Sequence, residues 1–140
     1  MLDHNKLYKQ SLIQIRRKGE AEVLHELRHF FVYNWVDHSI VCPSEEALLK
    51  KLIQNMGESL IKCPTQPIVV HCSAGIGRTG TLISLCQLFN EYKLSLQEKE
   101  EFRFSVYDTV LRLRHMRAFM VQTASQYIFI HSFLYKYLAE

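Results

Sequence analysis

Residues 67–80, PIVVHCSAGIGRTG, place a cysteine, three glycines and an arginine close together. The apolar run before Cys72 favours a strand buried on both faces, and the apolar residues after Arg78 favour a helix. Gly75 and Gly77 permit the backbone conformations of a tight turn between these two elements. Because the N-terminus of a helix has unpaired N–H groups, such a turn can bind a phosphate. The segment therefore predicts an anion cradle.

Cys72 and Arg78 are the two side chains of this cradle that could do chemistry. The planar guanidinium of Arg78 can hold two phosphate oxygens at once. Positive surroundings lower the pKa of a thiol, and a Cys72 thiolate could attack phosphorus. The alternatives are a buried packing cysteine and a phosphate site without turnover. We favour the nucleophile, because this spacing of glycine, arginine and threonine after one cysteine arises by chance about once in a few thousand tries.

The composition is that of one soluble globular domain, with 48% hydrophobic and 22% charged residues among 140. The net charge of +3 is scattered, which favours anionic substrates mildly and gives little support to nucleic-acid binding. No run is long enough for a transmembrane helix, and the N-terminus lacks the features of a secretory signal. We therefore expect a cytoplasmic protein with free thiols, in which Cys42, Cys63 and Cys86 are packing or incidental residues.

The elements around the cradle are predicted from apolar periodicity. Residues 10–15 and 22–35 resemble two strands of an antiparallel hairpin with its turn at 16–20. Residues 44–62 form an amphipathic helix that Ser44 can cap, with apolar residues recurring at four-residue steps. Its apolar residues are Leu48, Leu52, Met56 and Leu60.

Three further helices are expected: one after Arg78, one around Val110, and one over residues 123–137. Residues 97–102 form a solvated connection between the first two. The strand at 67–72 would follow the helix at 44–62 in a βαβ-like unit. The predicted fold class is α/β of the α+β type, with a mixed, largely central sheet and helices packed on it.

Three segments together resemble the protein tyrosine phosphatases. HCSAGIGRTG matches the family's H-C-x-x-G-x-x-R-[ST] signature, and its wording is similar to the phosphotyrosine-specific branch. NWVDHS, residues 34–39, resembles the mobile W-P-D loop. Residues 111–130, LRLRHMRAFMVQTASQYIFI, resemble the R-x-x-R and Q-T-x-x-Q segment. The resemblance extends from about residue 7 to residue 137, and it implies that residues 1–140 are a single, N-terminally truncated domain of this family.

The resemblance implies hydrolysis of phosphotyrosine through a phosphocysteine intermediate. Cys72 would be the nucleophile, Arg78 would bind the phosphoryl oxygens, and Asp37 would protonate the leaving phenolic oxygen. Gln122 would position the hydrolytic water, with Gln126 beside it. Positive charge would come from arginine and backbone dipoles, so no metal or cofactor is expected. The cradle backbone would run through Ser73, Ala74, Gly75, Ile76, Gly77 and Arg78, supported by His71, Thr79 and Trp35.

Several of these residues have ordinary structural alternatives. Thr123 and Gln126 have the spacing of a helix capping box, so Gln126 could satisfy backbone donors instead of contacting water. His71 could tune the thiolate or be a satisfied core histidine. Arg114 and Arg117 could orient loops, although arginines on helices are most often surface residues.

The sequence also departs from the family pattern. In W-P-D-H-G, Val36 replaces the proline and Ser39 the glycine, while Ala118 stands where proline is usual. Domains of the family are about twice this long, and the absent half normally supplies a tyrosine loop that clamps the substrate ring. Two functions therefore remain: a phosphatase of phosphotyrosyl proteins or peptides, and a weak or inactive domain that binds phosphotyrosine or a partner. A dual-specificity phosphatase is a third, weaker option, and uncovered surfaces would favour self-association.

Overall fold

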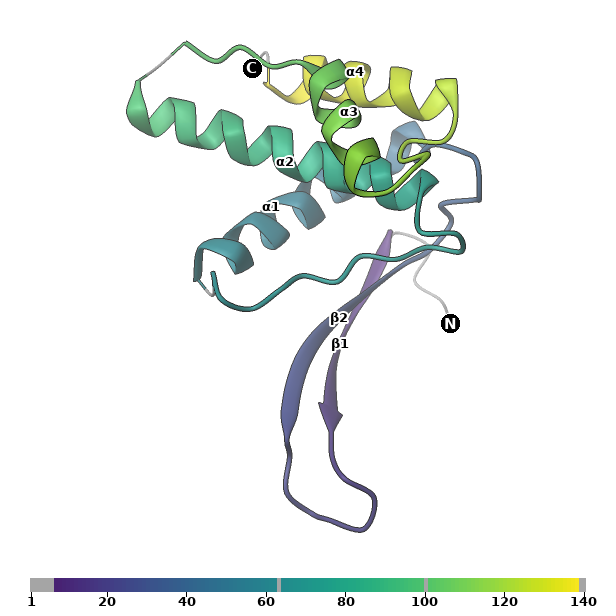
Figure 1. Cartoon of the computed structure of the whole chain (residues 1–140), viewed down its shortest axis with the longest axis vertical. Coiled ribbons are helices and arrows are strands. Elements are labelled where there is room, and N and C mark those ends of the chain that lie inside the picture. The colour runs from purple at the N-terminus through teal and green to yellow at the C-terminus, as the bar shows by residue number, and fades with distance from the viewer. Residues whose placement is uncertain (1–6, 63, 100, 139–140) are drawn as a thin grey trace. The chain divides into compact units, whose positions relative to one another are not determined.

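The computed structural model describes residues 7–62, 64–99 and 101–138 (Figure 1). Cys63 and residues 1–6 lie outside this part of the chain. The elements in order are β1 (Tyr8–Ile15), β2 (His25–Val32), a 3-10 turn (Pro43–Glu45), α1 (Glu46–Lys62), α2 (Gly77–Glu98), α3 (Val106–Met116) and α4 (Ala124–Leu138). They form two compact units that divide between Asn34 and Trp35. The predicted α+β class is confirmed.

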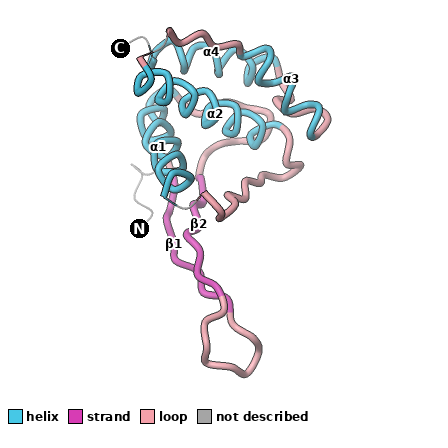
Figure 2. Tube along the Cα trace, turned by 60° about the vertical axis from the view of Figure 1, so that its left-hand side comes forward, coloured by secondary structure: helices cyan, strands magenta, loops and turns pink. Residues whose placement is uncertain are grey.

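The first unit contains the predicted hairpin, whose two strands are magenta in Figure 2. β1 pairs antiparallel with β2, from Tyr8 opposite Val32 to Ile15 opposite His25. Both strands expose apolar side chains along their length, including Leu12 at 61%. In the part of the chain that the structure describes, the sheet has only these two strands, so the predicted mixed central sheet is wrong.

Residues 67–72 do not form the buried strand that their apolar sequence predicts. Val69 is 83% exposed, and no described strand pairs with this segment. A strand is stabilised by a neighbour that takes up its backbone hydrogen bonds, and apolar side chains are buried only where another layer covers them. The described residues supply neither a neighbouring strand nor a covering layer for this segment. The prediction of a βαβ unit is therefore also wrong.

The second unit is built around α2, which contacts α1, α3 and α4 (Figure 1). Leu85 and Leu88 of α2 are fully buried, and the ring of Phe89 lies 5.9 Å from that of Phe133 in α4. None of the described helices is long and apolar enough to cross a membrane.

The four predicted helices are present, but the buried face of α1 differs from the prediction. The structure buries Leu49, Leu52, Ile53 and Gly57 of α1, whereas Leu60 is 38% exposed. An α-helix repeats every 3.6 residues, so a series at strict four-residue steps turns away from the core. Ser44 lies inside the 3-10 turn instead of capping the helix, and its hydroxyl contacts the Cys42 thiol at 3.2 Å.

Candidate active site

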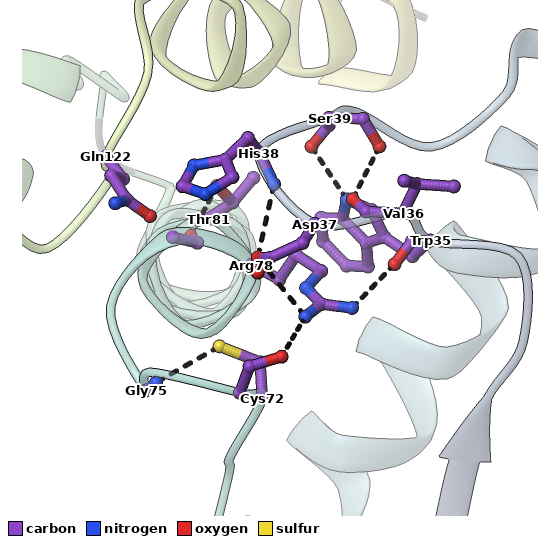
Figure 3. A network of polar contacts seen from close by, with 12 residues as sticks. Trp35, Val36, Asp37, His38, Ser39, Cys72, Gly75, Arg78, Thr81 and Gln122 are labelled. Atoms are coloured by element: carbon purple, nitrogen blue, oxygen red, sulfur yellow. Dashed lines mark hydrogen bonds and ion pairs between the residues drawn. The ribbon is translucent and has the colours of Figure 1, made fainter.

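The predicted cradle connects the exposed segment 67–72 with the N-terminus of α2. Gly75 has a φ of 71°, the left-handed conformation that glycine adopts without strain. This turn brings the Gly75 N–H to 3.2 Å from the Cys72 sulfur (Figure 3). α2 begins at Gly77 and no side chain caps it, so N–H groups of its first turn stay available to an anion. The local sequence therefore forms the predicted turn with its N–H donors, but without the strand that was expected before it.

Hydrogen bonds from the cradle lower the pKa of the Cys72 thiol. Burial raises this pKa and is the largest single effect, but the Thr79 side chain and the backbone N–H groups of Thr79, Gly75 and Ile76 together lower it by more. The result is a pKa of about 7 instead of 9.0 for Cys72. A substantial part of the thiol is therefore ionised at neutral pH, which is the form that acts as a nucleophile.

The pKa of Cys72 predicts how its reaction with iodoacetamide depends on pH. Below the pKa the thiol is protonated and reacts slowly; above it the thiolate reacts, so the rate should rise with a midpoint near pH 7. Mass spectrometry of the Cys72 peptide measures this rate. In the same samples Cys86 should stay unmodified, because burial raises its pKa to about 12. A midpoint near pH 9.0 for Cys72 would contradict the prediction.

Arg78 connects the cradle to the loop that carries Asp37. Its Nη1 donates to the Trp35 carbonyl at 2.8 Å, and its Nη2 donates to the Ser73 hydroxyl at 2.7 Å. Nη2 also lies 3.2 Å from Asp37 Oδ1 in an ion pair. In Figure 3 the guanidinium lies between Asp37 and the loop of Cys72. Arg78 therefore joins Asp37 to Ser73, the residue next to Cys72, so two distant segments meet at one site.

Two buried polar atoms at this site have no hydrogen-bond partner among the described residues, Arg78 Nε and Thr79 Oγ1. The Thr79 hydroxyl lowers the pKa of Cys72 although it makes no hydrogen bond of regular geometry, so we regard it as a nearby dipole. A buried donor without an acceptor is unfavourable, and an anion in the cradle could satisfy Arg78 Nε.

The glutamines lie in the segment that leads into α4. Gln126 is fully buried, and its Oε1 accepts the backbone N–H groups of Gln122 and Thr123 at 3.0 and 3.2 Å. The Gln126 N–H donates to Thr123 Oγ1 at 3.2 Å, which forms the capping box that the sequence offered as an alternative. Gln122 is exposed, and its Oε1 would lie 3.1 Å from a Cβ added at Gly77. Of the two side chains, Gln122 is thus the one free to meet a ligand.

Arg114 and Arg117 hold the loops around the site, a role that sequence reasoning ranked below that of ordinary surface residues. Arg114 donates through Nε to the Met120 carbonyl and through Nη2 to the Val121 carbonyl, both at 2.9 Å. Arg117 Nη2 donates to the Ala74 carbonyl at 3.1 Å. The signal in the sequence is the pair of arginines three residues apart, with Arg114 in the last turn of α3 and Arg117 just after its end.

His71 is exposed, so of its two alternatives the satisfied core histidine is excluded. It is not among the groups that shift the pKa of Cys72. His71 and Cys72 line a hollow of about 400 Å³ together with Ile83, Arg117 and Met120. Asp37, Arg78 and Gln122 do not line this hollow, so it is separate from the side of the loop where the ion pair lies.

The site thus combines an ionisable thiol, a cluster of N–H donors, a guanidinium and a carboxylate. A thiolate can attack the phosphorus of a phosphate ester, the donors can hold the phosphoryl oxygens, and a carboxylic acid can protonate the leaving oxygen. This is the equipment of a cysteine-based phosphatase.

Comparisons with known proteins agree with this class. The family model "Protein-tyrosine phosphatase" matches residues 2–136. The chain is 37% identical over 137 residues to human tyrosine-protein phosphatase non-receptor type 9, covering 89% of this chain and 21% of that protein. It is 42% identical over 126 residues to rat receptor-type tyrosine-protein phosphatase V, covering 87% and 7%.

Solved structures show the same relationship. The Trypanosoma cruzi protein tyrosine phosphatase TcPTP1 superposes with a TM-score of 0.73 at 32% identity, over 98% of this chain and 46% of that chain. The Trypanosoma brucei enzyme TbPTP1 gives a TM-score of 0.74 at 29% identity, over 93% and 42%. The chain belongs to the protein-tyrosine phosphatase family. It spans less than half the length of these two relatives and at most about a fifth of the two named above.

Proposed function

We propose that this chain hydrolyses phosphotyrosine in proteins or peptides through a phosphocysteine intermediate. The observation that carries the proposal is the meeting of Arg78, Asp37 and the cradle at one site, where the pKa of Cys72 is lowered to about 7. Family membership supports the reaction class. Because relatives are longer, we further propose that residues 1–140 are one part of a tyrosine phosphatase domain, N-terminally truncated relative to them.

In the first step the Cys72 thiolate attacks phosphorus and the bond to the tyrosyl oxygen breaks. Backbone N–H groups of residues 73–78 and the Arg78 guanidinium hold the phosphoryl oxygens while their charge redistributes. The incoming phosphate competes with Asp37 for Arg78 Nη2, which is now 3.2 Å from Asp37 Oδ1. Asp37 then donates its proton to the departing phenolic oxygen. The products are a phosphocysteine and a free tyrosine side chain.

In the second step water attacks the phosphocysteine. Gln122 orients this water, Asp37 accepts its proton, and the sulfur of Cys72 leaves as thiolate with the electron pair of the S–P bond. Inorganic phosphate is released and Asp37 is again protonated. Cys72 returns to its starting form, so one cycle consumes one phosphotyrosine and one water molecule.

A second function is a phosphotyrosine-binding or interaction domain with little turnover. The observation in its favour is the exposure of residues that a longer domain would cover, including Val69 at 83% and Ile61 at 71%. Such surfaces would also support self-association. For either function we propose a cytoplasmic protein whose partners are phosphotyrosine-containing chains.

The test is phosphate release from a phosphotyrosyl peptide by the purified chain, compared with its Asp37→Ala variant. Loss of the general acid should lower kcat by about 10²-fold. KM should not rise, because the phosphate no longer competes with Asp37 for Arg78 Nη2. No release by the wild-type chain at mildly acidic pH would contradict the phosphatase proposal and favour the binding domain.

A further inference from the structure

The turn that carries Asp37 is strained. The Ser39 N–H donates to the Val36 carbonyl at 3.2 Å, which closes a four-residue turn over residues 36–39. His38, its third residue, has a φ of 59°. A positive φ at the third position of a turn favours glycine. Since His38 carries a Cβ, the turn needs additional contacts to hold its shape.

The Ser39 hydroxyl provides the shortest of these contacts. It donates to the Val36 carbonyl at 2.6 Å, so this one oxygen accepts both the N–H and the O–H of Ser39 (Figure 3). A longer contact of 3.3 Å reaches the Ile40 carbonyl. Position 36 is valine and not proline, so no pyrrolidine ring restricts its φ. The Ser39 side chain therefore takes the part in fixing the turn that a proline would otherwise take.

The backbone of Ser39 also joins the turn to its surroundings. Its carbonyl accepts the Trp35 Nε1–H at 3.0 Å and the Gln126 Nε2–H at 3.3 Å. Gln126 is fully buried and Trp35 is 7% exposed, so both donors are held by packing. The position of Ser39 therefore determines how the turn lies against Trp35 and the start of α4.

We propose that the Ser39 hydroxyl is a positioning group that holds turn 36–39 in the conformation in which Asp37 faces Arg78. Without the hydroxyl, the strained turn would populate open conformations, and the indole of Trp35 would lose its fixed acceptor. The effect on turnover rests on the proposed function, whereas the effect on the turn itself does not.

The first measurement is fluorescence, because Trp35 is the one tryptophan of the chain. In Ser39→Ala we expect a red-shifted emission and stronger quenching by acrylamide. Ser39→Thr, which keeps a hydroxyl, should retain the wild-type values. Ser132→Ala is the matched control, since the Ser132 hydroxyl also donates to a carbonyl three residues earlier, that of Phe129 at 3.0 Å. Far-UV circular dichroism verifies that each variant is folded.

The second measurement compares aryl phosphates with different leaving groups. A general acid matters most when the leaving phenol is basic, so Ser39→Ala should lower kcat/KM for phenyl phosphate by about two- to tenfold, the contribution of one hydrogen bond. The loss should be smaller for dinitrophenyl phosphate, whose leaving group needs no proton, and KM should change little.

Unchanged Trp35 emission and quenching in a folded Ser39→Ala chain would overturn the inference. An equal change in Ser39→Thr would also overturn it, because the hydroxyl would then not be responsible. So would an equal loss of kcat/KM for both leaving groups, since kcat/KM reports the step in which the leaving group departs, and the effect on that step would not act through Asp37. If the wild-type chain releases no phosphate, the proposed function fails and fluorescence alone decides the inference.

Discussion

Replacement of Cys72 by serine is expected to lower the release of phosphate from a phosphotyrosyl peptide by about 10⁴-fold or more. The hydrogen bonds of the cradle lower the pKa of the thiol to about 7, so Cys72 supplies a thiolate near neutral pH. A serine hydroxyl ionises far less readily than a thiol, so the first covalent step is lost. The measurement is phosphate release from this one peptide by the wild-type chain and by Cys72→Ser. Mass spectrometry of both intact proteins shows whether either carries a covalently bound phosphoryl group.

Binding should survive this substitution, because the donors that hold the phosphate are unchanged. A fluorescent phosphotyrosyl peptide should therefore bind Cys72→Ser with nearly the wild-type Kd. Cys42→Ser is the control, because Cys42 is an exposed cysteine. Within the described part of the chain, its sulfur forms a hydrogen bond only with the Ser44 hydroxyl. Turnover that persists in Cys72→Ser at more than about a hundredth of the wild-type rate would exclude the phosphocysteine route.

Replacement of Arg78 by lysine is expected to lower kcat by about 10²- to 10³-fold, the usual cost of removing a preorganised donor to transition-state charge. Lysine keeps the charge but offers no planar pair of N–H groups. It would also lose one of the present contacts, to the Trp35 carbonyl, the Ser73 hydroxyl or Asp37. Kinetics with a phosphotyrosyl peptide measure the loss, and Trp35 fluorescence should change in the same variant.

Arg112→Lys is the matched control for this substitution. Arg112 also forms an ion pair, with Glu91 at 3.3 Å, but its side chain is 56% exposed on the surface of α3. Exposed ion pairs contribute little, so kcat should stay within about twofold of the wild type. Equal activities of Arg78→Lys and Arg112→Lys would contradict the assignment of Arg78 to the transition state.

The part of the site that could be predicted from sequence is local along the chain. The interval from Cys72 to Arg78 spans one turn and the start of one helix, so glycine positions and residue types were enough to predict the cradle. The capping box of Thr123 and Gln126 is equally local, and its hydrogen bonds are present. The four helices were predictable because each carries its own apolar periodicity.

Other features needed the tertiary structure because they join segments far apart in the chain. Arg78 and the Trp35 carbonyl are 43 residues apart, and no periodicity encodes their contact. The same holds for Gln126 and Ser39, which are 87 residues apart. Ser39 could be read from sequence only as a lost glycine, whereas the structure shows its hydroxyl closing a turn.

The segment before Cys72 shows most clearly what a sequence-based prediction lacks. Its apolar residues favour burial, but burial requires neighbouring segments that residues 67–72 cannot supply by themselves. The described chain offers no strand beside residues 67–72, and Val69 is exposed. By itself the sequence predicted which residues could react and determined the local turn from Cys72 to the start of α2. The tertiary structure decided which distant groups reach the cradle and which apolar residues are covered, because both depend on packing between segments.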